Sequence, residues 1–503
     1  MLAVEMIEAG ARRFSGRVAV SVEGESLSFA AVDELSSRLA NAMAGLGLAP
    51  LERVGILFGN ELLTVVVDFA ALKARLVRVP LNARLSAVEH ASMISSAGVR
   101  QVLFSPALAD RASELETLCE GVEFISIGRN HSNKVDLLAA AAAASPTRPS
   151  HDYQPDDAIL ALFTSGTTGT LKAALHTQAS YGAIVANILA NLVSPTRDDV
   201  MIHAAPLIHA SGTFILPFWL RGARAHVMSG FDPQSYLQAC ATERVTHASV
   251  VPTMVQMLLA TAFPHSLDLA LRSVIYGASP MPGATIAEAI EAFGPIFTQY
   301  YGQTEAPLAI SVLPADEHAV GSDLISSAGA VSVDARVSIL NKDLAVCGVG
   351  EIGEVTVEAP FVMAGYLDAE ALNRETFLAP KRIRTRDMGY FDDMGYLHLV
   401  DRASDMIITG GYNVYPREVE EVLLSHPGVA ECGVVGRSDA TWVEAVVAFV
   451  TPKPGVSLDA GELRDFARTR LAGYKVPKEV ILTGTLPKSA VGKVLRRALK
   501  ERL

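Results

Sequence analysis

A segment rich in glycine and hydroxyl side chains, Thr164 to Lys172, is the strongest chemical signal in the sequence. It reads TSGTTGTLK and directly follows the apolar run 158–163, so it is expected on a loop that leaves a strand. Glycine lets the backbone approach phosphate oxygens closely, exposed N–H groups form an anion-binding nest, and hydroxyls with one ammonium complete the donor set. The segment is not a Walker A loop, because no G-K-[ST] occurs. It predicts a polyphosphate site, and the alternative is a turn that binds nothing.

Two further side chains, Glu305 and His209, are candidates for chemistry. Glu305 ends the string YGQTE at 301–305, and His209 lies in the string PLIHASG at 206–212. A carboxylate on a loop can hold Mg²⁺, a hard ion that takes few protein carboxylates and relies on phosphate oxygens for its other ligands. A lone glutamate is more often a solvated surface residue, and a lone histidine on an apolar run is more often part of a core.

The elements that must position these residues indicate an α/β architecture as far as about residue 400. Arg53–Phe58 and Val99–Phe104 are apolar runs typical of buried strands, and Phe29–Leu46 has apolar residues at helical spacing. Strands that alternate with helices favour largely parallel or mixed sheets. The segment Asp136–Ser150 is expected to be a helix followed by a surface loop.

The pattern changes near residue 403. A strand at Met406–Thr409, a Gly-Gly turn and a helix from Pro416 are followed by further short strands and one helix, near Gly461–Leu471. About 100 residues are enough for a domain that folds alone. We therefore predict a large N-terminal domain at 1–402, a hinge at 403–405 and a small, mobile α+β domain at 406–503.

The composition describes a globular chain of more than one domain. The 503 residues are 50% hydrophobic and 19% charged, with a formal net charge of −12, so nucleic acid is not an expected partner. The four cysteines are scattered, which argues against a disulfide framework or a structural zinc. No apolar run reaches bilayer length and the start lacks a signal-peptide pattern, so we expect no transmembrane segment and a cytoplasmic protein.

The glycine-rich segment resembles the signature T-S-G-T-T-G-x-P-K-G of the adenylate-forming superfamily, which includes acyl-CoA synthetases, peptide-synthetase adenylation domains and luciferases. Leu171 replaces the usual proline and Ala173 the usual glycine. The resemblance implies that this loop binds ATP through Thr164, Ser165, Gly166, Thr167, Thr168, Gly169 and Lys172.

Three more strings resemble motifs of this family, in the family's order. In Y-G-x-T-E, which includes Tyr301 and Gly302 here, Thr304 is expected to contact the α-phosphate and Glu305 to hold Mg²⁺. The string YGASP at 276–280 is similar to the segment that lines the adenine and the acyl pocket, here Gly277, Ala278 and Ser279. The string around His209 is similar to P-L-x-H-x-x-G, which implies a position beside the reacting carboxylate.

Two motifs near the hinge also resemble the family's. The string RTRD at 384–387 replaces x-T-G-D, so Asp387 is expected to bind the ribose while Arg386 takes the place of a glycine. The string DRASD at 401–405 resembles the hinge motif, in which Arg402 contacts the ribose. Ser404 then occupies the hinge position that lysine or aspartate usually fills.

The last two strings assign roles to the small domain. GGYNVYP at 410–416 is similar to G-G-x-N-x-x-P, with Tyr412 where glutamate is common. The resemblance implies that Gly410 and Gly411 line the pantetheine channel in the second half-reaction. LPKSAVGK at 486–493 resembles the terminal motif whose last lysine, here Lys493, catalyses adenylation.

The resemblance implies an acid–thiol ligase of the AMP-forming type that uses ATP, Mg²⁺ and coenzyme A. The stretches assigned to the acyl pocket, at 209–213, 250–254, 276–278 and 300–302, are mostly small or apolar. They favour a medium-chain fatty acid or an aromatic monocarboxylate. A malonyl-CoA synthetase ranks third, with Arg221, Arg224 or Arg272 serving the second carboxylate, although Arg272 is more readily a structural contact.

Other functions remain open from the sequence. An acyl-AMP ligase that loads a carrier protein shares these motifs, and an amino-acid adenylation enzyme would need an acidic pocket residue that we do not find. The substitutions at Leu171, Ala173, Arg386, Ser404 and Tyr412 motivate a non-catalytic ligand-binding relative. The retained Lys172, Glu305, Asp387, Arg402 and Lys493 argue against it. Family members occur as monomers and as dimers, so a homodimer is possible.

Overall fold

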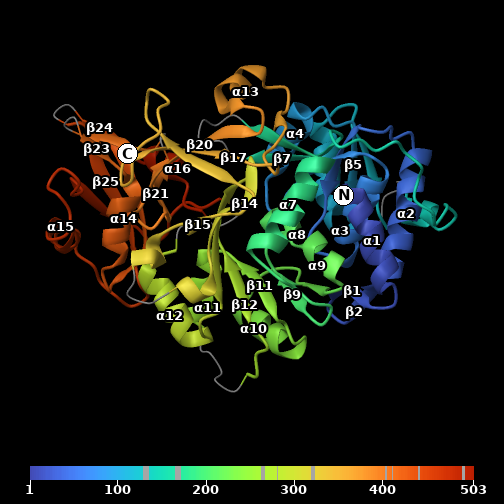
Figure 1. Cartoon of the computed structure of the whole chain (residues 1–503), viewed down its shortest axis with the longest axis horizontal. Helices are drawn as coiled ribbons and strands as arrows, with labels where there is room; N and C mark the ends of the chain where they lie inside the picture. Colours follow the sequence, from blue (N-terminus) through green and yellow to red (C-terminus); the bar gives the residue numbers. More distant parts are fainter. Residues whose placement is uncertain are drawn as a thin grey trace.

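The fold is taken from a computed structural model of the chain. It describes all residues except 129–134, 165–170, 262–266, 280, 319–322, 403–404, 410–411, 440–441 and 490–492. Figure 1 shows the sheets and helices of the N-terminal four-fifths on the right and centre, and the C-terminal elements on the left. In the described part of the chain, no helix is both long and apolar enough to cross a membrane.

The first large sheet is mixed. Its inner strands run parallel, and antiparallel strands close its edges. In spatial order the strands are β15 (Ala330–Val331), β14 (Ala306–Leu313), β13 (Phe297–Gln303), β12 (Ser273–Tyr276), β11 (His247–Val250), β9 (Val200–His203), β10 (Arg224–Val227), β1 (Val18–Val22) and β2 (Glu25–Ser28).

The second large sheet is also mixed, with parallel strands from β7 to β6 and antiparallel strands at the other edge. Its spatial order is β18 (Gly365–Tyr366), β8 (Lys172–Thr177), β7 (Ala158–Thr164), β4 (Val77–Pro80), β3 (Arg53–Leu57), β5 (Gln101–Phe104) and β6 (Glu123–Ser126). The expected strand Val99–Phe104 starts two residues later, because the Val99 N–H donates to Ile94 O (3.0 Å) and closes the preceding helix.

Helices fill the space between these two sheets and cover their outer faces. The inner group is α1 (Ala3–Phe14), α2 (Phe29–Gly45), α3 (Leu62–Lys73), α6 (Leu137–Ala141), α7 (Gln178–Asn191), α8 (Ala210–Thr213) and α9 (Ile215–Arg221). The outer helices are α10 (Pro233–Thr242), α11 (Pro252–Leu259) and α12 (Gly283–Phe293) on the first sheet, and α4 (Ala87–Ser96) and α5 (Ala109–Leu118) on the second. Short 3₁₀ turns are η1 (Pro106–Leu108), η2 (Ala315–Glu317) and η3 (Asp323–Ser326).

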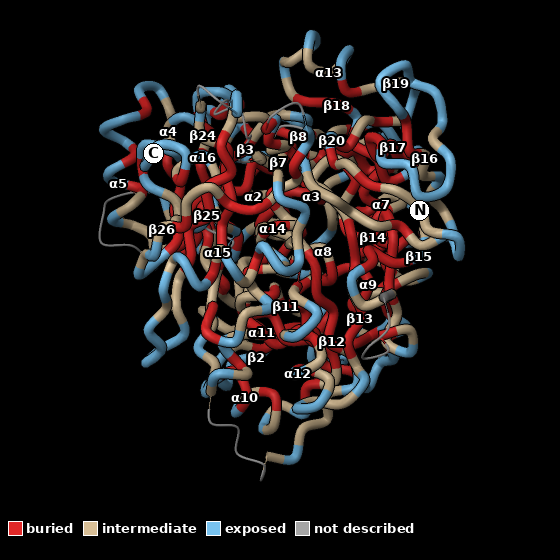
Figure 2. The backbone as a smooth tube through the Cα atoms, turned by 90° about the vertical axis from the view of Figure 1, so that its left-hand side faces the viewer, coloured by how far each residue is buried: buried red, intermediate tan, exposed pale blue. Residues whose placement is uncertain are grey.

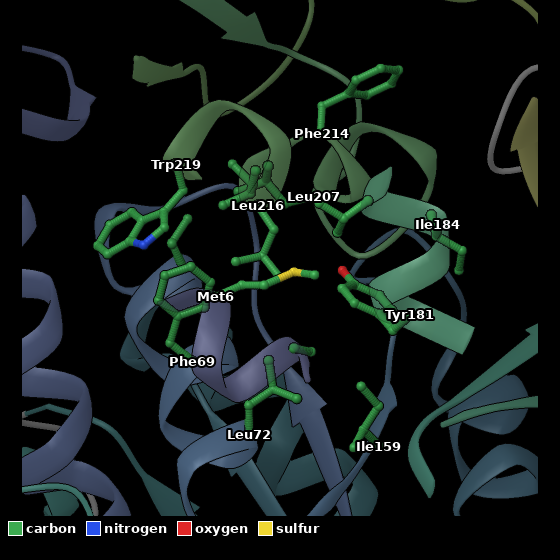
Figure 3. Packing of buried hydrophobic residues seen from close by; sticks show 14 of the residues in the cluster. Met6, Phe69, Leu72, Ile159, Tyr181, Ile184, Leu207, Phe214, Leu216 and Trp219 are labelled. Atoms are coloured by element: carbon green, nitrogen blue, oxygen red, sulfur yellow. The ribbon is translucent and has the colours of Figure 1, made fainter. Parts of the chain in front are cut away.

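The largest hydrophobic cluster joins the inner helices to both sheets. Figure 3 shows the indole of Trp219 near Phe69 and Met6 in this layer, and the Phe69 and Trp219 ring centroids lie 5.0 Å apart. The Trp219 Nε1–H donates to Ile7 O at 2.8 Å, and a Cβ at Gly10 would lie only 2.2 Å from that nitrogen. Helix α1 can therefore approach α9 closely only with glycine at this position.

A smaller antiparallel sheet follows and leads to the C-terminal part. It contains β16 (Arg336–Leu340), β17 (Gly353–Glu358), β20 (Arg382–Phe391) and β19 (Phe377–Ala379), with β21 (Leu397–Arg402) on the other edge of β20. Helix α13 (Glu370–Thr376) lies between β18 and β19 in the chain.

The C-terminal part has its own sheet and core. The sheet contains β23 (Tyr412–Val414), β22 (Ile407–Thr409), β25 (Val443–Pro452), β24 (Val429–Asp439) and, parallel to β25, β26 (Glu479–Leu482). Helices α14 (Pro416–Leu424), α15 (Ala460–Arg468) and α16 (Arg496–Lys500) pack on it. In Figure 2 the buried segments concentrate in strands and on inward helix faces, and exposed residues gather at surface turns. The predicted α/β class, with a small α+β C-terminal part, is confirmed.

Candidate active site

The glycine-rich segment lies at the end of a β-hairpin. Strands β7 and β8 pair antiparallel, and Thr164 is opposite Lys172, so these two residues stand at the base of the loop. Its residues Ser165, Gly166, Thr167, Thr168 and Gly169 lie outside the described part of the chain.

The two substitutions in this motif fit the hairpin. Ala173 is buried in β8, where its C=O accepts the Leu367 N–H at 2.8 Å, and it lacks the positive φ that would require glycine. Leu171 packs its partly buried side chain on the hydrophobic cluster beneath the second sheet. Ala173, with its small side chain, therefore fits the strand position where the family motif has glycine.

A second hairpin presents Thr304 and Glu305 at its tip. Gln303 pairs with Ala306 across β13 and β14, which leaves Thr304 and Glu305 as the two turn residues. Gly302 precedes them, and a Cβ there would lie 2.2 Å from the Leu308 carbonyl oxygen. Only glycine fits this close approach, so the local backbone fixes where the glutamate stands.

Glu305 is surrounded by groups from the second sheet. The Tyr366 hydroxyl donates to Glu305 Oε1 at 2.5 Å, and the Lys172 Nζ lies 5.6 Å from the centroid of the same phenol ring. Burial, and then the charge of Glu305, raise the pKa of Tyr366, so the phenol stays a donor. The His176 ring fixes the neighbouring backbone through a 2.8 Å contact between its Nε2 and Thr304 O.

Asp387 is buried and bonded by several donors. The Tyr301 hydroxyl and the Gln303 amide donate to its Oδ2 at 2.7 and 2.5 Å, and the Arg402 Nε lies 3.3 Å from its Oδ1. Asp387 and Arg402 are direct partners across β20 and β21, so sheet pairing brings the two expected ribose ligands together. Burial is the main reason that the pKa of Tyr301 is raised.

Arg386 keeps the local backbone of a glycine. Its φ is 64°, in the left-handed region, at the point where the register of β17 and β20 shifts. Its N–H donates to Glu354 Oε1 at 3.2 Å, and its guanidinium lies 3.7 Å from Glu375 Oε2. Arginine thus adopts, at a bulge, a backbone conformation that favours glycine, the residue that the family motif has here.

The expected adenine and acyl segment follows β12. Ala278 has a φ of 68°, and a Cβ at Gly277 would lie 2.6 Å from the Tyr300 carbonyl oxygen. The Tyr276 hydroxyl is already engaged, because it donates to Gln299 Oε1 at 2.9 Å and lies 2.8 Å from His318 Nε2. Ser279 closes the described part of this segment.

His209 lies directly before helix α8 and is held by Asn82. The Asn82 Nδ2 lies 3.1 Å from the His209 Nε2, and Asn82 itself is buried after strand β4. Burial, and then the charges of Arg84 and Lys493, lower the pKa of His209 to about 4. The imidazole is therefore neutral at physiological pH.

Lys493 reaches this same site from the C-terminal part. Its ammonium interacts with Arg402, Asp387, Glu305 and His209. The residue is exposed at the surface, yet neighbouring protein atoms exclude part of the water around its ammonium group. This desolvation and the charge of Arg402 lower the pKa of Lys493 to about 8. The structure thus brings Lys493 together with the carboxylates and His209 of the N-terminal part.

The remaining predicted residues belong to the hinge and the glycine turn. Ser404, Gly410 and Gly411 lie outside the described residues. Tyr412, paired with Thr409 across β22 and β23, is 57% exposed and stacks on Tyr474 with ring centroids 4.4 Å apart.

Sequence reasoning missed three residues of the site, Tyr366, Gln303 and Asn82. Asn82 follows soon after the short buried strand Val77–Pro80, and a polar residue at the carboxyl end of a buried strand is a usable signal for a ligand site. Gln303 stands at the variable position of its motif. Tyr366 belongs to a two-residue strand, and nothing in its local pattern marks it.

The arginines considered for a second carboxylate are engaged elsewhere or lie apart. Arg272 pairs with Asp199, and Arg224 with Glu243. Arg221 lines a surface groove of about 770 Å³ together with Arg13, Arg17 and Arg197. None of the candidate site residues lines that groove, or a second one of about 600 Å³ beside α10. These positions disfavour a malonate pocket built on the three arginines.

The donor set suits a divalent ion that is held mainly by a polyphosphate. Within the described ranges, no group of three or more His, Cys, Asp or Glu side chains could hold a metal ion. Glu305 has one oxygen bonded to Tyr366 and lies beside the base of the glycine-rich loop. Because Mg²⁺ binds through one or two carboxylates plus substrate phosphates, Glu305 fits this ion.

Comparison with known proteins agrees with this arrangement. The sequence profile of the AMP-binding enzymes matches residues 7–367, and that of the AMP-binding enzyme C-terminal domain matches residues 418–493. A feruloyl-CoA synthase of an Amycolatopsis species is 36% identical, over 98% of this chain and 97% of its own. A medium/long-chain-fatty-acid–CoA ligase of Mycobacterium tuberculosis is 33% identical, over 93% of this chain and 84% of its own. The solved amide bond synthetase of Marinactinospora thermotolerans superimposes with a TM-score of 0.92 at 28% identity, over all of both chains.

Proposed function

The chain belongs to the AMP-binding enzymes, and from that premise we propose which residues carry its reaction and which acids it accepts. It is an AMP-forming acid–CoA ligase that uses ATP, Mg²⁺ and coenzyme A. The observation that supports the assignment of roles is that Lys493 lies within electrostatic range of Glu305, Asp387 and Arg402, which are far from it in sequence.

In the first half-reaction a carboxylate oxygen of the acid attacks the α-phosphorus of ATP, and pyrophosphate leaves. An anion approaches a polyanion, so fixed positive charges must offset the repulsion and the charge that develops on the transferred and leaving oxygens. Lys493 and Lys172 supply ammonium groups, and Thr304 a hydroxyl for the α-phosphate. The Mg²⁺ held by Glu305 supplies further positive charge when bound.

Asp387 and Arg402 orient the nucleotide. Their pairing across two strands and the buried donors of Tyr301 and Gln303 support a rigid ribose site. Ribose hydroxyls can donate to the Asp387 carboxylate, whose position does not depend on a mobile loop. Precise orientation of the reacting groups can lower the activation barrier of such a reaction by about 7 kcal/mol or more.

In the second half-reaction the thiol of coenzyme A attacks the acyl carbon of the adenylate, the bond from this carbon to the AMP phosphate oxygen breaks, and the thiol proton passes to solvent. His209 is a poor base for the thiol proton because its pKa is about 4. Its role is to position the acyl carboxylate, and its neutral ring avoids a fixed charge beside the acyl group. Gly410 and Gly411, on a mobile domain at 406–503 that turns about Ser404, are proposed to line the thiol channel.

The acid is proposed to be an aromatic monocarboxylate, or a medium-chain fatty acid. The buried apolar side chains of Val250, Met254 and Tyr300 support a pocket for an apolar body. The feruloyl-CoA synthase and fatty-acid ligase relatives support the same two classes.

We place this activity in the cytoplasm, where ATP and coenzyme A are available. Cys119, Cys240, Cys347 and Cys432 are free thiols, in keeping with a reducing compartment. All described residues of the candidate site belong to one chain.

A pyrophosphate-release assay over a panel of acids, each with and without coenzyme A, tests this function. The panel spans acetate to laurate, benzoate, cinnamates including ferulate, malonate and several amino acids. We expect turnover that requires both an aromatic or medium-chain acid and coenzyme A. Release that coenzyme A does not sustain would indicate a carrier-protein acceptor, and silence across the panel with ATP binding intact would indicate a non-catalytic relative.

A further inference from the structure

Asp401 stands on the N-terminal side of the predicted hinge, and its carboxylate is bonded by groups from the C-terminal side. It lies on β21, where it pairs with Met388 of β20, so it belongs rigidly to the sheet that carries Asp387. Its side chain is only 4% exposed. A buried carboxylate needs compensation by charges or donors, and the nature of its partners shows what it holds.

The first partner is the start of helix α14. The residue before this helix, Tyr415, makes no side-chain capping bond, and the helix begins with Pro416. Asp401 Oδ2 instead accepts the Arg417 N–H at 2.8 Å. Asp401 thus caps a helix that lies beyond the hinge, and a carboxylate at a helix N-terminus is favourable for the helix dipole as well.

The second partner is Arg496, the first residue of α16. Its Nη1 donates to Asp401 Oδ1 at 2.8 Å and to Asp405 at 2.9 Å, while its other nitrogens bind Glu420 of α14. Arg496 therefore joins two C-terminal helices to a carboxylate of the N-terminal sheet. A third contact, from Arg417 Nη1 to Leu399 O at 3.0 Å, reinforces the same junction.

Lys493 is only three residues before Arg496. The intervening segment is fixed to residues 487–488, because Val494 forms an isolated antiparallel bridge with Lys488 and the Leu495 N–H donates to Pro487 O at 2.8 Å. The bond between Arg496 and Asp401 therefore anchors the segment that carries Lys493, whose ammonium is within electrostatic range of Glu305 and Asp387. Any rotation of the C-terminal part about residues 403–405 must break this bond and uncap α14.

We infer that Asp401 is a positioning residue that holds the C-terminal part in the arrangement for adenylation, through Arg496 and the start of α14. This inference rests on the proposed two-step function. It predicts that Asp401 serves the first half-reaction and not the second, since only the first needs Lys493 in place. It also predicts that the Asp401–Arg496 contact sets the equilibrium between the arrangement of the C-terminal part for adenylation and its arrangement for thioester formation.

The test compares Asp401→Ala and Asp401→Asn with Arg437→Ala. Arg437 pairs with Glu479 inside the C-terminal sheet, so its loss removes an ion pair that does not cross the hinge. Single-turnover formation of acyl-adenylate is expected to fall about 10²-fold or more in Asp401→Ala, the effect of losing two charge-assisted hydrogen bonds, and less in Asp401→Asn. Thioester formation from supplied acyl-adenylate should stay within about 2-fold of the parent protein or rise.

Hydrogen exchange gives a readout that needs no substrate. The amides of residues 417–419 should lose protection in Asp401→Ala and keep it in Arg437→Ala, because only the first change uncaps α14. Equal loss of both half-reactions in the folded variants, unchanged adenylation, or unchanged exchange at 417–419 would overturn the inference. If the parent protein forms no acyl-CoA, the proposed function fails, while the exchange measurement still decides the role of Asp401.

Discussion

Lys493 and Glu305 define what single side chains contribute to this site. Lys493 supplies an ammonium group whose pKa is lowered by desolvation, and Glu305 supplies a carboxylate that is oriented by the Tyr366 hydroxyl. Neither residue is unusual by itself, since both types are common on surfaces. Their chemistry comes from the charges and donors that the fold places around them.

Removal of the Lys493 ammonium should separate the two half-reactions. We expect Lys493→Ala to lower adenylation by about 10²- to 10³-fold, as loss of one preorganised charge in a transition state does. Thioester formation from supplied acyl-adenylate should be nearly unchanged. Rapid-quench assays of each half-reaction provide the measurement, with Lys500→Ala, an exposed lysine of α16, as the control. Equal loss in both steps would remove the role assigned to this lysine.

The lowered pKa of Lys493 predicts a particular pH dependence. The group is charged below about pH 8 and loses its proton above it. Adenylation kcat/KM should therefore be constant below this value and fall as the pH rises through it. Bound ATP carries negative charge, which stabilises the Lys493 ammonium and raises its pKa. The fall in kcat should therefore begin at a higher pH than the fall in kcat/KM.

Pyrophosphate exchange measured from pH 6 to 10 checks this profile. Lys493→Arg, whose guanidinium does not titrate in this range, should be slower and lack the alkaline limb. A limb near pH 8 that persists in that variant would assign it to another group.

Site residues that stand in family motifs could be predicted from the sequence, and those outside such motifs were missed. Lys493, Glu305, Asp387 and Arg402 stand in strings that resemble family motifs, and the structure brings these four together. Tyr366 acts through a contact with Glu305, which is distant in sequence, so no local spacing indicates it. Asn82 leaves a local signal outside the family motifs, its place at the carboxyl end of a buried strand. The pKa shifts were likewise beyond sequence reasoning, because they follow from burial and neighbours.

Hairpins and paired strands are the elements that turn these residues into a site. The β7–β8 hairpin carries the base of the glycine-rich loop, and the β13–β14 hairpin presents Thr304 and Glu305. Strands β20 and β21 bring Asp387 and Arg402 side by side. Strand pairing fixes positions more precisely than long loops do, which suits a reaction that depends on orientation.

The close approach at Gly302 offers a test of the second hairpin. A Cβ at this position would meet the Leu308 backbone, which cannot move without displacing β14. We expect Gly302→Ala to destabilise the fold by about 1–3 kcal/mol and to displace Thr304 and Glu305. Urea unfolding and the Mg²⁺ dependence of adenylation are the measurements.

Gly230→Ala is the matched control for this substitution, because no atom lies within 4 Å of its added Cβ and its φ is not positive. A Gly302→Ala protein with the stability and Mg²⁺ requirement of its parent would show that the close approach does not position Glu305.

Many element positions could be predicted, and the differences have local causes. The strand Arg53–Phe58 and the helix Phe29–Leu46 are found as β3 and α2 within one residue, since apolar periodicity marks a buried face. The helix expected near Gly461–Leu471 ends earlier, at Arg468, where the Arg470 N–H donates to Ala467 O at 3.0 Å in the tighter i to i−3 pattern. Strand order was not predictable, because neighbours such as β10 and β1 are far apart in sequence.

For the molecule as a whole, the notable feature is that the site is shared between two parts of the chain. Helices between two sheets form a rigid base, and the C-terminal part with its own core contributes Lys493. The net charge of −12 produces an overall field that repels anionic substrates, so positive side chains at the site are needed to attract and bind them. A ligase whose acid, ATP and coenzyme A are all anions therefore needs its positive groups gathered at one place.

The most direct test of this account is the product balance of a single reaction mixture. The protein is supplied with Mg-ATP, coenzyme A and the best acid of the panel, and acyl-CoA, AMP and pyrophosphate are quantified together by mass spectrometry and an enzymatic assay. We predict equal amounts of all three products, none without the acid, and loss of all three in Lys493→Ala. Release of ADP and phosphate, or AMP and pyrophosphate formed without any thioester, would contradict the assignment as an AMP-forming acid–CoA ligase.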